Sequence, residues 1–292
     1  MSDAVARLKA QLPEHPSVDE LTPLADDYTG LRILAVHAHP DDESSKGSAS
    51  AAAYTDRGAR YMVATMTGGE RGDILNEEIK HSPRAHRDLP GMRRSEMAAA
   101  AKAIGIEHRW MGFVDSGLPE GDPMPPLPFG CFGVQPLERA AAPLVRLVRE
   151  YRPHVMISYD EIGGYPHPDH IMSHKVAVEA YEKAGDPEAY VGEGQPWAPL
   201  KLYYDRAFNP ERLVAGHEFL MARDGQSVFS GWVENLVDQV STEGIRHEST
   251  TRIPSSAYFD RRDQAMLAHA SQIDPNGAFF AIPTEDVKKV WP

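Results

Sequence analysis

The stretch Leu31-Arg-Ile-Leu-Ala-Val36 is apolar except for Arg32 and has the length of a single β-strand. It leads into the polar run His39-Pro-Asp-Asp-Glu-Ser44. A second apolar run, His154–Tyr159, is followed by the compact cluster His167-Pro-Asp-His170. Open α/β sheets bind their ligands at the carboxyl ends of the strands. The two polar clusters are therefore predicted to meet in one crevice.

Apolar runs of strand length alternate along the chain with segments of helical pattern. Strands are expected at residues 31–36, 61–66, 110–114, 154–159 and 201–208. Helices are expected at residues 45–55, 92–104 (closed by Gly105), 137–151 (kinked by Pro143 or starting there) and 168–183 (with Pro168 in the first turn). This alternation predicts βαβ units, and so an α/β protein with a mostly parallel sheet and helices on both faces.

The two ends of the chain lack this regular alternation. Residues 1–28 are polar and punctuated by proline, which predicts an N-terminal extension with one short helix at Val5–Leu12. We expect residues 29–292 to form a single catalytic domain. Its sheet-bearing core is expected at about 29–208, and a smaller C-terminal cap at about 209–292, where the periodicity weakens.

Composition excludes several classes of protein. With 41% hydrophobic and 25% charged residues, the 292-residue chain is typical of a globular protein. Its net charge of −13 argues against a nucleic-acid partner, because such binding depends on clustered Lys and Arg. The single cysteine, Cys131, allows neither an internal disulfide nor a cysteine-based zinc cluster, and we expect it to be an inert thiol.

No segment resembles a secretory signal, and no run of eighteen apolar residues could cross a membrane. We therefore expect a cytoplasmic protein with no membrane partner that acts on a small molecule. The sequence leaves open whether it forms a homo-oligomer.

His39 and Asp42 are three residues apart in the turn that leaves the first strand, and His170 supplies a third candidate ligand. Two histidines and one carboxylate with an open position are typical of a hydrolytic zinc site. A lone histidine is more often a surface or hydrogen-bonded residue. Two clusters at strand ends favour one Zn²⁺ per chain, although Fe²⁺ suits the same ligands. His174, one helical turn beyond His170, is a weaker rival ligand.

Carboxylates and an imidazole beside these ligands suit acid–base chemistry. Asp41 is a candidate general base, with capping of the following helix as the alternative. His167, as a protonated imidazole, is a candidate for stabilising an oxyanion. Asp169 would orient a histidine, or would only interact favourably with the helix dipole.

The loop Thr67-Gly-Gly-Glu-Arg-Gly72 could cradle an anion, and Glu70 could accept a hydrogen bond from a sugar hydroxyl. A solvated loop charge is the more frequent role of such a glutamate, and the loop lacks the Lys-Ser/Thr ending of a P-loop. No Gly-x-Gly-x-x-Gly follows the first strand, which argues against a dinucleotide-dependent oxidoreductase.

The strings Ala38-His-Pro-Asp-Asp-Glu43 and His167-Pro-Asp-His170 resemble the two signatures of the PIG-L/LmbE family of zinc-dependent N-deacetylases, whose fold is Rossmann-like. Further strings extend the likeness to the mycothiol S-conjugate amidase branch over about residues 31–292. These strings lie at residues 36–47, 67–72, 112–119, 163–170, 201–204 and 272–276.

The resemblance implies a role for each matching residue. It makes His39, Asp42 and His170 the zinc ligands and Asp41 the base. It also implies that His167 stabilises the oxyanion with Asp169 holding it in place, and that Tyr165 reaches the scissile carbonyl. Residues with implied contacts to the substrate are Arg93 and Asp115, which would grip inositol and glucosamine hydroxyls, and Lys46, which would favour the cysteinyl side.

The implied reaction is hydrolysis of the amide between glucosamine and an S-substituted N-acetylcysteine, which releases a mercapturic acid and glucosaminyl-inositol. The main alternative is a deacetylase that acts on N-acetylglucosaminyl-inositol, because both reactions share the metal chemistry. A tailoring amidase for a thiol-conjugated natural product also stays open. A non-catalytic sugar-binding protein is disfavoured because it would not need Asp41.

Overall fold

The computed structural model of the chain describes residues 3–10, 12, 20–121, 123–206, 209–243 and 249–291. The chain divides into two compact units. One, here called the helical unit, comprises Met1–Leu24, Phe208–Asp260 and Pro275–Pro292. The other, the sheet unit, comprises Ala25–Ala207 and Arg261–Asp274 and holds every residue predicted for the site.

The sheet unit is built on five strands in the order β3-β2-β1-β4-β5, and every neighbouring pair is parallel. The strands are β1 (Arg32–His37), β2 (Arg60–Thr67), β3 (Glu107–Phe113), β4 (Val155–Tyr159) and β5 (Lys201–Asp205). The predicted α/β fold with a mostly parallel sheet is confirmed. The last predicted strand, at residues 201–208, ends at Phe208, which lies outside the described residues.

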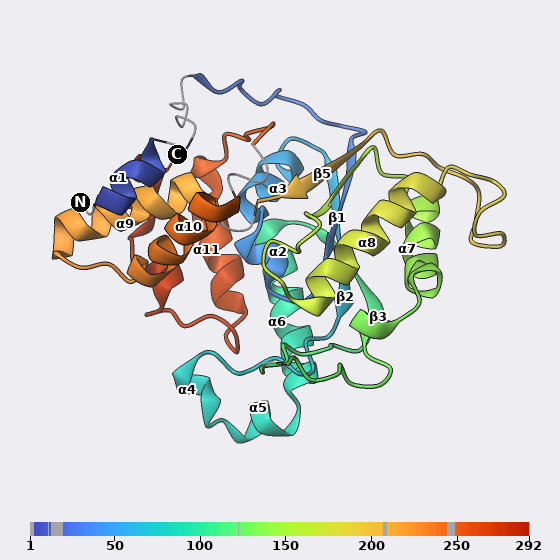
Figure 1. Cartoon of the computed structure of the whole chain (residues 1–292). Coiled ribbons are helices and arrows are strands. Elements are labelled where there is room, and N and C mark those ends of the chain that lie inside the picture. The colour runs from blue at the N-terminus through green and yellow to red at the C-terminus, as the bar shows by residue number, and fades with distance from the viewer. Residues whose placement is uncertain are drawn as a thin grey trace. The chain divides into compact units, whose positions relative to one another are not determined.

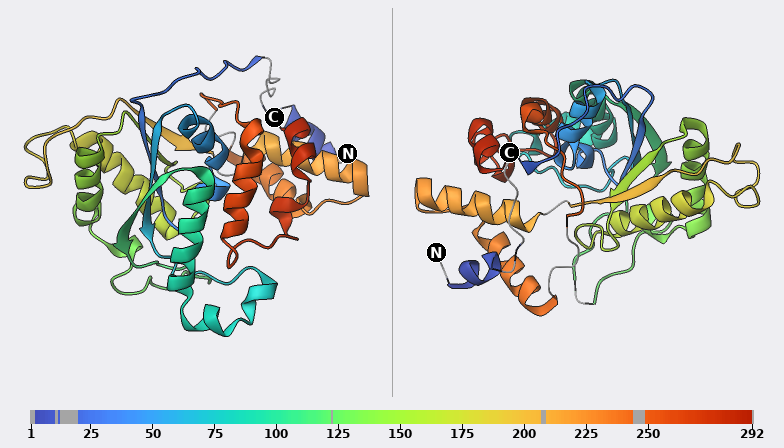
Figure 2. Two further views of the ribbon diagram at one scale, coloured as in Figure 1. Left: turned by 180° about the vertical axis from the view of Figure 1, so that it is seen from behind. Right: turned by 90° about the horizontal axis from the view of Figure 1, so that it is seen from above.

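The sheet unit contains the helices α2 (Asp42–Ser45), α3 (Ser48–Thr55), α4 (Glu77–Lys80), α5 (Pro83–Arg87), α6 (Leu89–Ile104), α7 (Leu137–Tyr151), α8 (Pro168–Lys183) and, from Arg261 on, α11 (Phe259–Ala268). Four of them cover the two faces of the sheet. Helices α7 and α8 lie on one side of the sheet, and α3 and α6 on the other (Figures 1 and 2). Leu144, Val148 and Val176 of α7 and α8 form a buried core with Leu34 and Met156 of the strands.

The predicted helices at 137–151 and 168–183 have the observed bounds. Helix α7 runs through Pro143, so that proline is not its start. Helix α6 ends at Gly105, whose positive φ of 86° suits glycine because a Cβ would be strained there. Strand β3 begins at Glu107, three residues before the predicted start at Trp110.

The helical unit contains α1 (Asp3–Lys9), α9 (Pro210–Asp224), α10 (Ser230–Glu243), the start of α11, and α12 (Thr284–Val290). Val5 and Leu8 of α1 are buried against Val214 and Val233 of α9 and α10. Short 3₁₀ turns complete the described structure at Phe132–Val134, Ser256–Tyr258 and Ala278–Phe280. The predicted division into extension, core and cap stays a prediction. None of the described helices is long and apolar enough to cross a bilayer.

The sheet changes its direction of winding between β1 and β4, because the chain places β2 and β3 on one side of β1 and β4 and β5 on the other. Loops at the carboxyl ends of the two strands diverge at this point and leave a crevice for a ligand. His39 and Asp42 follow β1, and His167 and His170 follow β4. The topology therefore brings the two predicted clusters to the same place.

Candidate metal centre

The turn after β1 holds His39 and Asp42 in a fixed arrangement. The backbone N–H of His39 donates to Asp42 Oδ2 at 2.9 Å, which closes the turn across Pro40. The hydroxyl of Tyr159, the last residue of β4, donates to the same oxygen at 2.7 Å. The carboxylate of Asp42 is thus positioned from both strands at the switch point.

His170 lies in the first turn of α8, which begins at Pro168. Its Nδ1 lies 2.9 Å from the carbonyl oxygen of Gly163, so Nδ1 carries the proton and Nε2 keeps a free lone pair. This Nε2 is buried and has no hydrogen-bond partner within the described part of the chain. It lies 3.5 Å from Asp42 Oδ2, and the Tyr159 ring stacks on the imidazole. An unsatisfied buried nitrogen beside a carboxylate is typical of a metal ligand.

His39, Asp42 and His170 have ligand atoms within 4.8 Å of one another, and all three are buried. Burial lowers the pKa of His170 to about 3, so its imidazole is neutral. Burial alone would raise the pKa of Asp42, but the Lys46 ammonium beside it holds the pKa well below its ordinary value. Metal ions require neutral imidazoles and ionised carboxylates. These residues therefore fit a divalent cation.

His39 stands among carboxylates. Burial would lower its pKa, but contacts with Asp115, Asp169 and Asp42 raise the pKa well above its ordinary value. Its Nδ1 lies 3.6 Å from Asp42 Oδ2, and its Nε2 lies 3.3 Å from Asp169 Oδ2. A buried group of negative charges stabilises a positive charge at its centre, whether from a proton or from a metal ion.

A second group with ligand atoms within 4.8 Å of one another combines His39 with Asp115 and His167. Here most lone pairs already have partners. Asp115 accepts from the N–H of Arg71 at 3.0 Å and of Gly117 at 2.7 Å. Nδ1 of His167 accepts from the backbone N–H of Asp169 at 3.1 Å. Asp42 also accepts from His39, Tyr159 and Lys46, so the two groups differ at the histidine. Nε2 of His170 has no hydrogen-bond partner among the described residues, and the group that contains it is therefore the better cation site.

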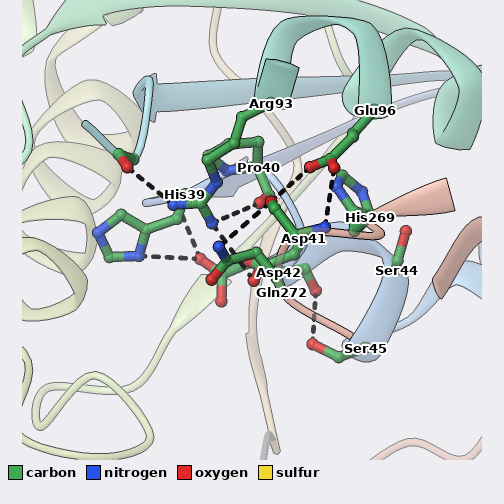
Figure 3. A network of polar contacts seen from close by, with 12 residues as sticks. His39, Pro40, Asp41, Asp42, Ser44, Ser45, Arg93, Glu96, His269 and Gln272 are labelled. Carbon is green, nitrogen blue, oxygen red and sulfur yellow. Dashed lines mark hydrogen bonds and ion pairs between the residues drawn. The ribbon is translucent and has the colours of Figure 1, made fainter. Parts of the chain in front are cut away.

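Asp41 lies between the two predicted ligands of the β1 turn and has an unusual backbone conformation, with φ 131° and ψ −25°. Its side chain makes no capping hydrogen bond to α2 among the residues that the structure describes. Its Oδ2 lies 3.5 Å from Arg93 Nη2 (Figure 3). Burial raises the pKa of Asp41, although Arg93 opposes this shift. The geometry leaves the carboxylate available for chemistry.

The remaining residues predicted for catalysis are gathered around the same centre. The Asp169 carboxylate accepts from the N–H of Ser116 at 2.9 Å and from its hydroxyl, and its contact with His167 comes from the backbone. The Tyr165 ring lies 4.6 Å from the ring of His170. The rival ligand His174 contacts the carbonyl oxygen of Tyr159 instead and belongs to neither ligand group.

The residues predicted to bind substrate line the same region. The Lys46 ammonium pairs with Asp42 Oδ1. Glu70 accepts from the N–H of Asp115 at 3.0 Å. Arg93 is buried and donates to the carbonyl oxygens of Gly69 and Pro40 at 2.9 and 3.0 Å. These contacts locate the side chains, and their roles toward a substrate stay predictions.

Sequence reasoning missed three residues that organise the centre. Tyr159 positions Asp42 and His170, and its place at the end of a strand was the available signal. Glu43 and His269 form a fully buried pair, with Nε2 of His269 2.7 Å from Oε1 of Glu43. These two residues are 226 positions apart in the sequence, so no local pattern connects them.

The sequence of the chain resembles those of known proteins over most of its length. Residues 34–181 match the PIG-L family, described as GlcNAc-PI de-N-acetylase. The chain is 47% identical over 264 residues to the mycothiol S-conjugate amidase of Streptomyces coelicolor, and this match covers 90% of the chain and 89% of the relative. It is 38% identical to the 1D-myo-inositol 2-acetamido-2-deoxy-alpha-D-glucopyranoside deacetylase of Streptomyces avermitilis, over 89% of the chain and 88% of the relative. The chain belongs to the PIG-L family.

Solved structures show the same fold at low sequence identity. The N,N'-diacetylchitobiose deacetylase of Pyrococcus horikoshii superposes with a TM-score of 0.56 and 15% identity, over 83% of this chain and 70% of that one. The conserved protein TT1542 of Thermus thermophilus gives 0.51 and 21% identity, over 89% of this chain and 84% of that one. The predicted Rossmann-like fold is confirmed.

Proposed function

We propose that this protein is a metal-dependent amidase that cleaves mycothiol S-conjugates. The scissile bond is the amide between glucosamine and the S-substituted N-acetylcysteine, and the products are a mercapturic acid and glucosaminyl-inositol. One observation carries the chemistry: His39, Asp42 and His170 converge within 4.8 Å at the switch point of the sheet, beside a carboxylate that is not a ligand. The 47% identity to a mycothiol S-conjugate amidase supports the substrate class.

In this proposal the three converging residues hold one Zn²⁺, with Fe²⁺ as the alternative ion. When bound, such an ion acts as a Lewis acid that polarises the amide carbonyl and makes water more acidic. The protein keeps the ligands ready. Gly163 fixes the tautomer of His170, and Tyr159 fixes the orientation of the Asp42 carboxylate.

Asp41 acts as the general base and takes a proton from the attacking water. A base must hold a proton long enough to deliver it to the leaving amine, so a raised pKa suits this role. Burial supplies that rise, while the nearby Arg93 guanidinium limits it. The turn directs the Asp41 carboxylate away from the capping position of α2.

His167 stabilises the negative charge that develops on the carbonyl oxygen. Burial and the neighbouring His39 lower the pKa of His167 to about 4, so the ring is neutral. Its Nδ1 already accepts from the N–H of Asp169, which places the proton on Nε2. Nε2 is thus a fixed donor for an oxyanion, and Tyr165 lies beside it as a second polar group near the carbonyl.

Four residues are proposed to recognise the two ends of the substrate. Arg93 and Asp115 would meet the hydroxyls of inositol and glucosamine, with Glu70 beside them. Lys46, whose ammonium pairs with Asp42, would favour the cysteinyl side, as the resemblance to the amidase branch implies. We also expect the enzyme to act in the cytoplasm.

A second candidate function is deacetylation of N-acetylglucosaminyl-inositol. The observation that favours it is 38% identity to the Streptomyces avermitilis deacetylase over 89% of the chain. Both reactions hydrolyse an amide on the same amino sugar, so they differ only in the acyl group that the site accepts.

Specificity constants for the two substrates test the proposal. Protein purified without oxygen and with measured metal content is incubated with bimane-labelled mycothiol and, separately, with N-acetylglucosaminyl-inositol. We expect kcat/KM for the bimane conjugate to be at least about 10-fold higher, a difference of about 1.4 kcal/mol in transition-state binding. A higher constant for the acetylated sugar would favour the deacetylase. Protein stripped by a chelator serves as the control and should be inactive with both.

A further inference from the structure

Three consecutive buried or partly buried carboxylates follow the first strand, an arrangement that is costly unless each charge has a partner. The structure supplies a different basic side chain for each of them. The pairs are Asp41 with Arg93, Asp42 with Lys46, and Glu43 with His269. The first two carboxylates belong to the proposed reaction and metal site. Glu43 and His269 have no role in it so far.

The conformation of Asp41 explains why a third pair is useful. A φ of 131° is unfavourable for a residue with a Cβ, and such a conformation persists only where the surroundings impose it. The backbone N–H of Asp41 donates to Glu43 Oε2 at 3.0 Å. The carbonyl oxygen of the same peptide unit, that of Pro40, accepts from Arg93 Nη2 at 3.0 Å. Two side chains thus hold the Pro40–Asp41 peptide unit, one at its N–H and one at its carbonyl oxygen.

Glu43 is itself fixed by neighbours that do not touch the proposed metal ligands. Its Oε1 accepts from the Ser44 hydroxyl and lies 2.7 Å from Nε2 of His269. His269 is fully buried just beyond α11. The backbone N–H of His269 donates to the carbonyl oxygen of Met266 at 3.0 Å. The carbonyl oxygen of His269 accepts from the backbone N–H of Gln272 at 2.9 Å. The backbone of His269 is therefore held in place, and its buried imidazole contacts the Glu43 carboxylate through Nε2.

We propose that His269, acting through Glu43, is a positioning residue that holds Asp41 in the conformation required of the base. The proposal rests on the proposed function, because Asp41 is the base only in that reaction. His269 belongs to the segment Arg261–Asp274 of the sheet unit, and Figure 3 shows it in the same polar network as Asp41 and Arg93. The residue affects turnover without contacting substrate or metal.

Two substitutions at this position separate positioning from packing. His269→Ala removes the donor to Glu43, whereas His269→Gln keeps an amide N–H at a similar distance from the backbone. Ser271→Ala is the matched control. Ser271 lies in the same segment and donates from its N–H and hydroxyl to Glu96 at 2.8 and 2.7 Å, with no bond to Glu43. Ser271→Ala therefore measures how much a lost hydrogen bond in this segment affects activity when the contact between His269 and Glu43 is kept.

We expect His269→Ala to lower kcat about 10- to 100-fold, because a displacement of about 1 Å in a reacting group has an effect of this size. KM and metal content should stay within about twofold of wild type, since the substrate contacts and ligands are unchanged. His269→Gln should recover most of the lost kcat. Ser271→Ala should lower the melting temperature by a similar amount with a kcat close to wild type.

Equal kcat for His269→Ala and Ser271→Ala would overturn the proposal, as would a His269→Gln variant no faster than His269→Ala. If the wild-type protein hydrolyses neither amide, the proposed function fails. The positioning role is then tested by crystal structures of wild type and of metal-loaded His269→Ala. A positive φ at Asp41 in both structures would overturn the positioning role. A change of φ at Asp41 in that variant, with positive φ in wild type, would support it.

Discussion

The two ligand groups that share His39 look alike in composition but differ in how their lone pairs are used. Each adds one aspartate and one histidine to His39, and each has ligand atoms within 4.8 Å of one another. In the first group, His170 has a buried Nε2 with no hydrogen-bond partner among the described residues. In the second, Nδ1 of His167 accepts from a backbone N–H. The aspartates do not separate the groups, because Asp42 and Asp115 both accept hydrogen bonds.

This difference shows that proximity of suitable residues does not define a metal site. A ligand needs a lone pair that is directed at the site and otherwise unused, while a residue that orients a substrate or stabilises charge can have its other atoms bonded. We therefore propose that Asp42 and His170, together with His39, hold the cation. In this proposal Asp115 and His167 serve the substrate and the reaction.

The strongest test of this comparison removes His170, the histidine that is proposed as a metal ligand. His170→Ala removes the free Nε2, so we expect metal content to fall below about one tenth per chain. Turnover should then fall by about 10⁴-fold or more, because the Lewis acid is lost. Metal analysis of the purified variant and amide hydrolysis measure the two effects. Normal metal content in this variant would show that the ion lies in the other group.

Asp41 belongs to neither group, and its substitution separates the base from the ligands. Asp41→Asn keeps the shape of the side chain but cannot accept a proton. We expect a loss of about 10³- to 10⁴-fold in kcat with metal content unchanged, in line with the size of general-base catalysis. Single-turnover kinetics with metal-quantified protein measures this loss. A near-normal rate would rule out Asp41 as the base.

Substitution of His167, the histidine of the second group, should affect the reaction and leave the metal in place. His167→Ala should keep the metal and lower kcat about 10²- to 10³-fold, the size expected for one donor to an oxyanion. KM should change little, because this hydrogen bond strengthens only as charge develops. Loss of zinc from His167→Ala would make this residue a ligand and would remove the distinction between the two groups.

Much of this site was predictable from the sequence because its main residues lie at the ends of strands. Apolar runs before His39 and before His167 predicted β1 and β4, and parallel topology then required that the two clusters meet. The ligand group His39, Asp42 and His170 is observed as such a cluster. The four helices α9 to α12 were not predicted individually, because residues 209–292 were assigned only as a C-terminal cap.

What the sequence could not predict are contacts that depend on long-range packing. The pairing of His269 with Glu43 joins residues 226 positions apart, and no spacing rule relates them. The positive φ of Asp41 was equally hidden, because glycine, not aspartate, is the residue that signals such a conformation. The partners of Asp169 also differ from a simple pattern, since Ser116 and His39 contact its carboxylate and His167 contacts only its backbone.

The smallest effect is expected for Asp115, the aspartate of the second group. Asp115→Asn removes the negative charge beside His39 but keeps one carbonyl oxygen, which can accept from either Arg71 or Gly117. Because Asp115 is assigned to substrate hydroxyls and not to the cation, metal content should stay normal. We expect KM to rise by about 3- to 10-fold and kcat to change less, the pattern that follows when binding is lost equally from ground state and transition state. Initial rates over a range of conjugate concentrations separate the two constants, and a fall in kcat as large as that of His167→Ala would place Asp115 in the reaction itself.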